Sequence, residues 1–151
     1  MSRIVRCQAV ILKDDKILVL RQYNYKRQEE YWLLPGGGLE ENETTEQCIL
    51  RELREETGLK VEIKEILFDE PGNGIDPYQR YVTFLCTPLK DSVGAAGNET
   101  VSYRKILELK WISATDEKQW NKYILTEQFY PSMKMIKDRL EVKELVGGIK
   151  V

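Results

Sequence analysis

The stretch that decides the fold is residues 37–59, which read GGLEENETTEQCILRELREETGL. Its second half predicts a helix from Thr44 to Thr57. Thr44 followed three residues later by Gln47 is typical of a capping box at a helix N-terminus. Gly58 stands where a glycine ends a helix, so both boundaries of this helix are readable from the sequence.

The predicted helix carries three carboxylates on one face. Glu52, Glu55 and Glu56 are spaced i, i+3 and i+4, and they fall in the last turn, where the helix dipole is already negative. An exposed pair such as Arg51 with Glu55 offsets only about 0.3–0.5 kcal/mol of that repulsion. A hard divalent cation such as Mg²⁺ would be a fitting partner. An ordinary charged surface helix has the same letters, so the helix alone leaves both interpretations open.

Working outward, the flanking segments predict a mixed sheet covered by helices, an α/β layered fold. Strands are expected at Ile4–Leu12, Lys16–Tyr23, Tyr31–Leu34, Leu59–Glu70, Arg80–Pro88 and Ile106–Ser113. The first two form a hairpin around Asp14 and Asp15, and Gly36–Gly38 is expected to break any regular element. Residues 89–100 are predicted to form a polar loop. From Ala114 the chain turns helical, with Tyr130-Pro131 separating two segments, of which the second runs to about Leu145.

Composition narrows the chemistry. The 151 residues are 42% hydrophobic and have a net charge of −2, which predicts one globular domain over 1–151 and gives no general basic field for nucleic acid. Histidine is absent, which excludes histidine-based triads and imidazole zinc sites. The three cysteines lie in apolar runs and are expected to be buried and reduced. No apolar run approaches the about 20 residues of a membrane span, so a soluble, cytoplasmic protein is expected.

The pattern Gly37-x5-Glu43-x7-Arg51-Glu52-Leu53-x-Glu55-Glu56-x-Gly58-Leu59 fixes nine positions over 23 residues. At every fixed position it resembles the Nudix box, so the chain is similar to a Nudix (MutT-like) hydrolase, and the box covers about a sixth of it. The resemblance implies a Nudix-type α/β/α sandwich with a mixed β-sheet. It also implies hydrolysis of nucleoside diphosphates linked to another moiety, by attack of water on a phosphorus.

The resemblance also implies roles for individual residues. Glu52, Glu55 and Glu56, with the backbone carbonyl of Gly37, would hold one or more Mg²⁺ or Mn²⁺ ions. Glu52, oriented by Arg51, would activate the water, and Glu43 would support the loop and pair with Arg51. In some similar proteins a carboxylate well after the box is the base or a further metal ligand; Glu99 is the first candidate by position and Asp76 the second. The number of ions and the identity of the base stay open.

Residues outside the box would choose the substrate. Arg21 could reach a phosphate, and Tyr23, Tyr31 and Trp32 could stack on a base, although each fits packing or surface exposure equally well. Lys26 and Arg27 form a basic patch of two, too small to indicate RNA binding.

We therefore expect a metal-dependent pyrophosphohydrolase acting on a small nucleotide such as a (modified) dNTP. The alternatives are an ADP-ribose or sugar-nucleotide pyrophosphatase and a non-catalytic nucleotide-binding regulator of the same fold. Such a regulator is expected to have lost box carboxylates, and this chain keeps all three. A homodimer stays open, because dimers are common among similar proteins and these residues select no oligomeric state.

Overall fold

The first two strands form the expected hairpin. The computed structural model describes residues 4–72, 74, 77–89, 100–101, 104–120, 123 and 129–146. In it β1 (Val5–Lys13) and β2 (Lys16–Asn24) are antiparallel, with Lys13 opposite Lys16. Asp14 and Asp15 form the turn with φ of 50° and 62°. Two consecutive residues with positive φ give the tight turn whose twist matches the flanking strands, and aspartate tolerates that conformation.

The remaining elements follow the expected order, with two short strands, β4 and β7, that were not expected. They are β3 (Glu29–Leu33), β4 (Gly36–Gly38), α1 (Thr45–Thr57), β5 (Val61–Pro71), β6 (Arg80–Pro88), β7 (Thr100–Val101), β8 (Arg104–Ser113), α2 (Glu117–Trp120) and α3 (Met133–Val142). The helix α1 has the predicted capping box between Thr44 and Gln47, and Gly58 ends it at φ 73°. The helix α3 ends at Val142, three residues before the predicted boundary. None of the helices in the described part of the chain is long and apolar enough to cross a membrane.

The strands form a mixed sheet, as predicted. Its order is β5-β6-β1-β2-β8-β7, with β3 paired to β2 and β4 paired to β1. The pair β1–β6 is parallel, and the other pairs are antiparallel. The prediction that Gly36–Gly38 breaks all regular structure was wrong, because these glycines pair with Arg6–Gln8 as β4. A Cβ built on Gly36 would lie 2.2 Å from the carbonyl oxygen of Cys7, so glycine permits this close strand pairing.

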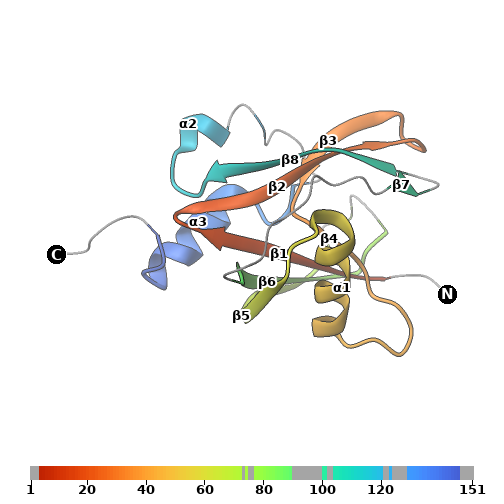
Figure 1. Cartoon of the computed structure of the whole chain (residues 1–151), viewed down its shortest axis with the longest axis horizontal. Coiled ribbons are helices and arrows are strands. Elements are labelled where there is room, and N and C mark those ends of the chain that lie inside the picture. Colours follow the sequence, from red (N-terminus) through yellow and green to blue (C-terminus); the bar gives the residue numbers. More distant parts are fainter. Residues whose placement is uncertain are drawn as a thin grey trace.

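The short strand β4 divides the sheet beside α1. It pairs with β1 at Arg6–Gln8, whereas β2 pairs with β1 at Leu12 and Lys13 and with β3 from Leu20 to Asn24. Figure 1 shows the result: β2, β3 and β8 form one half of the molecule, and β1, β5 and β6 form the other, with β4 and α1 beside them.

Helices cover both faces of the sheet. The apolar residues that α1 buries, Cys48, Ile49 and Leu53, pack in one cluster with Cys7, Ala9 and Ile11 of β1. The residues that α3 buries, Met133, Ile136 and Leu140, belong to a second cluster with Val10. Successive residues of a strand point to opposite faces, so these two clusters form the two layers of an α/β/α sandwich. All three cysteines are fully buried and free, as predicted.

Candidate active site

The three carboxylates of α1 differ in burial. Glu52 and Glu56 are 4% and 0% exposed, whereas Glu55 lies at the rim with 42% of its side chain exposed. Burial raises the pKa of Glu52, and it raises that of Glu56 to about 7, because the charged form loses its hydration. The predicted helical face is therefore present, with two of its carboxylates facing inward.

Arg51 ties this face to the loop before the helix. Its guanidinium donates to both oxygens of Glu43, with Nε–Oε2 at 2.6 Å and Nη2–Oε1 at 3.0 Å. Its Nη1 also donates to Glu52 Oε2 and to Glu55 Oε1, each at 3.0 Å. These hydrogen bonds hold the pKa of Glu43 down at about 2. The expected pairing of Glu43 with Arg51 is thus present, and the same guanidinium fixes one oxygen of Glu52.

Glu56 connects α1 to the two halves of the sheet. One of its oxygens accepts from the Gly36 N–H of β4 at 2.8 Å, and the other accepts from Arg104 Nη2 of β8 at 2.6 Å. Arg104 in turn donates from Nη1 to Gln22 Oε1 of β2 at 3.0 Å. Both oxygens of the buried Glu56 thus accept hydrogen bonds, one from β4 and one from β8, which a buried carboxylate requires.

Gly37 lies directly against Glu52. A Cβ on Gly37 would stand 2.3 Å from Glu52 Oε2, so the missing side chain leaves room for the carboxylate. The donors here are carboxylate oxygens and a backbone carbonyl, a set whose chemistry fits a hard divalent cation. In the described part of the chain no three acidic or thiol side chains converge as metal ligands, and the Arg51 guanidinium bridges Glu52 and Glu55.

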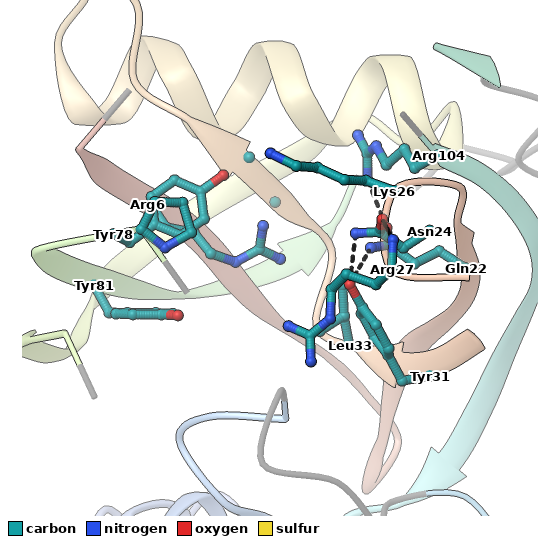
Figure 2. Close-up of a pocket in the computed structure, with 13 residues that line it drawn as sticks. Arg6, Gln22, Asn24, Lys26, Arg27, Tyr31, Leu33, Tyr78, Tyr81 and Arg104 are labelled. Atoms are coloured by element: carbon teal, nitrogen blue, oxygen red, sulfur yellow. Dashed lines mark hydrogen bonds between the residues drawn. The ribbon is translucent and has the colours of Figure 1, made fainter. Parts of the chain in front are cut away.

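A cavity of about 670 Å³ opens beside Gly36 and Gly37 (Figure 2). The described residues that line it are basic, aromatic or neutral. The basic ones are Arg6, Lys26, Arg27 and Arg104, and the aromatic ones are Tyr31, Tyr78 and Tyr81. The chemistry of this lining suits an anionic ligand that carries a planar group.

Arg21, Tyr23 and Trp32, which were expected to bind substrate, do not line this cavity. Arg21 instead pairs with Glu30 at 2.8 Å and Glu108 at 3.2 Å, and its guanidinium lies over the Trp32 ring. The reason is strand alternation, because each neighbouring residue along a strand points to the opposite face.

The neighbours of these residues do line the cavity. They are Gln22 and Asn24 on β2 and Tyr31 on β3. The side-chain amides of Gln22 and Asn24 both donate hydrogen bonds to the Tyr31 hydroxyl. Tyr31 was named from the sequence as a stacking candidate, whereas Arg6 and Tyr81 were missed. Glu99 and Asp76 lie outside the described residues.

Fold and site together define an α/β/α sandwich in which an acidic helix and a glycine strand border a basic cavity. The chain belongs to the NUDIX domain family, whose model matches residues 3–132.

Relatives with assigned names match parts of the chain. An RNA pyrophosphohydrolase of Dinoroseobacter shibae is 38% identical over 66 residues, which is 44% of this chain and 41% of the relative. An ADP-ribose pyrophosphatase of Methanocaldococcus jannaschii is 40% identical over 63 residues, or 42% of this chain and 37% of the relative. The matches thus span well under half the length of these relatives.

A solved structure supports the fold over nearly the whole chain. The crystal structure of a NUDIX-family hydrolase from Clostridium perfringens has a TM-score of 0.67 and 20% identity, covering 95% of this chain and 99% of that one. At this identity the likeness concerns the fold alone.

Proposed function

We propose that this protein is a divalent-metal-dependent hydrolase that cleaves a phosphoanhydride bond in a nucleoside-diphosphate-linked substrate. The substrate that we favour is a small nucleotide such as a (modified) dNTP. One observation carries the proposal: the buried carboxylates Glu52 and Glu56 adjoin Gly36 and Gly37, which also line a cavity rich in cations. Such a cavity would bring the phosphates of a nucleotide up to the acidic helix.

In this proposal Glu52, Glu55, Glu56 and the Gly37 carbonyl would hold Mg²⁺ or Mn²⁺. When bound, such an ion screens the charge of the phosphates and lowers the pKa of water. Arg51 donates to Glu52 Oε2, and Arg104 Nη2 lies 4.0 Å from Glu52 Oε1, the oxygen that would accept a proton from the attacking water. The cationic side chains of the cavity orient the phosphates, and the tyrosines exclude water around the base.

Hydrolysis of ADP-ribose or a sugar nucleotide is the second candidate. The similarity to the M. jannaschii relative named ADP-ribose pyrophosphatase favours it, while the D. shibae relative is named for RNA. A non-catalytic regulator is the third candidate, and the presence of Glu52, Glu55 and Glu56 argues against it.

The test is a turnover panel with Mg²⁺ or Mn²⁺. It contains dNTPs, 8-oxo-dGTP, ADP-ribose, nucleotide sugars, dinucleoside polyphosphates and capped RNA, and phosphate is read after adding pyrophosphatase or alkaline phosphatase. Pyrophosphatase-dependent signal on a dNTP is the expected result. Signal that requires alkaline phosphatase on an ADP-linked substrate would select the second candidate.

The variant Glu52→Gln is expected to abolish most of the turnover. Glu46→Gln is the matched control, because Glu46 lies in the exposed first turn of the same helix, away from the carboxylate face. Melting temperatures with and without Mg²⁺ give a second readout. No turnover across the panel, together with no effect of metal on melting, would overturn the proposal.

A further inference from the structure

The two buried carboxylates of α1 already have hydrogen-bond donors from the chain itself. Glu52 and Glu56 share four carboxylate oxygens, and within the described part of the chain three of these accept hydrogen bonds. The donors are Arg51 Nη1 to Glu52 Oε2 at 3.0 Å, the Gly36 N–H to Glu56 Oε1 at 2.8 Å and Arg104 Nη2 to Glu56 Oε2 at 2.6 Å. A divalent cation held by these carboxylates would therefore have to displace or share existing partners.

Arg104 is the donor that lies between the two carboxylates. Its Nη2 is 2.6 Å from Glu56 Oε2 and 4.0 Å from Glu52 Oε1, so one guanidinium nitrogen faces both groups. The side chains of Arg104, Glu52 and Glu56 are 7%, 5% and 0% exposed. Charges at such depth are screened much less than charges in water, so a second cation on the same oxygens would be strongly repelled by Arg104. Glu56 is therefore unable to pair well with both cations at once.

Arg104 has a further partner that would remain if it left Glu56. Its Nη1 donates to Gln22 Oε1 of β2 at 3.0 Å, and both residues line the cavity. Figure 2 shows the two side chains in the same wall of that cavity. Gln22 is neutral and only 5% exposed, so its amide oxygen would hold the guanidinium at the cavity wall. The loss of Glu56 as a partner thus leaves Arg104 with a hydrogen bond to a buried acceptor.

We propose that Arg104 competes with the divalent cation for Glu56 and is the counter-ion of the buried carboxylates until metal binds. This inference rests on the proposed function, in which Glu52 and Glu56 are metal ligands, and it adds a residue of β8 that sets how tightly the metal is held. Metal binding has to break a charge-assisted hydrogen bond first. The wild-type protein therefore binds metal more weakly than the same carboxylates would without Arg104. Removing Arg104 should then strengthen metal binding even though it removes a buried ion pair from the fold.

The test uses Mn²⁺ alone as the probe, and its binding is measured by the loss of the electron paramagnetic resonance signal of the free ion. Arg104→Met is expected to bind Mn²⁺ about tenfold to hundredfold more tightly than wild type, because no charge-assisted hydrogen bond has to be broken. Arg104→Lys keeps the charge but makes a point contact in place of a planar fork, so its affinity should lie between the two. Arg80→Met is the matched control, because it removes the same side chain from the exposed pair with Asp69 and should leave Mn²⁺ binding unchanged.

Melting temperatures give a second readout. Saturating Mn²⁺ is expected to raise the melting temperature of Arg104→Met more than that of wild type, because in the variant the metal replaces a missing cation. If Arg104→Met does not fold, the affinity of Arg104→Lys decides. Mn²⁺ binding that is equal to wild type or weaker in the folded Arg104 variants would overturn the inference, because Arg104 would then support the metal site rather than compete for it. Metal-dependent turnover in the substrate panel would still uphold the proposed function after that result, so the two failures are distinguishable.

Discussion

At the scale of single residues, Arg51 connects the loop before α1 to the helix face that carries Glu52 and Glu55. Its bond to Glu43 is bidentate, and the Glu43 side chain is only 13% exposed. That geometry is favourable for a charged pair, since a planar guanidinium matches both carboxylate oxygens. The orientation of Glu52 thus depends on a residue nine positions earlier in the chain.

Glu43→Gln should lower the free energy of unfolding by about 1–2 kcal/mol at pH 7, because a charge-assisted pair becomes a neutral one. The pKa of Glu43 falls from 4.5 to about 2 on folding, so its contribution is complete above pH 4.5 and is lost as pH falls towards 2. Urea unfolding at pH 7, 5, 4 and 3 checks this. A difference between wild type and variant that stays constant down to pH 3 would contradict it.

At the scale of elements, the backbone of β4 lies close both to β1 and to α1. Its first two residues, Gly36 and Gly37, have different neighbours. A Cβ on Gly36 meets the backbone of Cys7 and Gln8, whereas a Cβ on Gly37 meets the carboxylate end of Glu52. Backbone cannot move aside easily, but a flexible side chain can.

Gly36→Ala is therefore expected to cost about 3 kcal/mol of stability. Gly37→Ala is expected to change stability by less than about 1 kcal/mol, but to displace Glu52 and reduce turnover at least about tenfold. Urea unfolding and the rate on the substrate found in the panel distinguish the two. If Gly37→Ala kept full activity, the contact between Gly37 and Glu52 would have no role in the reaction.

The sequence predicted α1 closely, because capping residues fix both of its ends. It also predicted the β1–β2 hairpin, the strand β6 and the helix face that carries the carboxylates. It could not tell which face of β2 borders the cavity. Residues Ile17–Leu20 are buried on both faces, so β2 enters the site without an alternating pattern. For that reason Arg21, and not its neighbour Gln22, was predicted to contact the substrate. Arg6 could not be predicted as a cavity residue, because the cavity lies where β4 separates β2 from β1.

At the scale of the whole molecule, the pair Arg104–Glu56 joins the half that contains β2, β3 and β8 to α1 on the other half. Both side chains are buried, at 7% and 0% exposed. The exposed pair Arg80–Asp69, at 2.7 Å, is a natural comparison because its side chains are 47% and 43% exposed.

Arg104→Met should lower the free energy of unfolding by about 3–5 kcal/mol, because Glu56 would lose its cation and would have to stay charged in the interior or take up a proton. Adding Glu56→Gln should recover a substantial part, since the carboxyl that lost its partner is removed. Arg80→Met should cost at most about 1 kcal/mol, as exposed pairs do. Urea unfolding of the three variants measures these values. Equal losses in Arg104→Met and Arg80→Met would show that the buried pair does not link the two halves.

The burial of every cysteine has a practical consequence for spectroscopy. Cys7, Cys48 and Cys86 are each 0% exposed, and burial raises the pKa of Cys86 to about 12. A thiol engineered onto the surface would therefore be alkylated well before the native ones. A fluorophore or spin label at residue 26 would report directly on ligands entering between the two walls of the cavity, in a protein that needs no prior removal of its own cysteines.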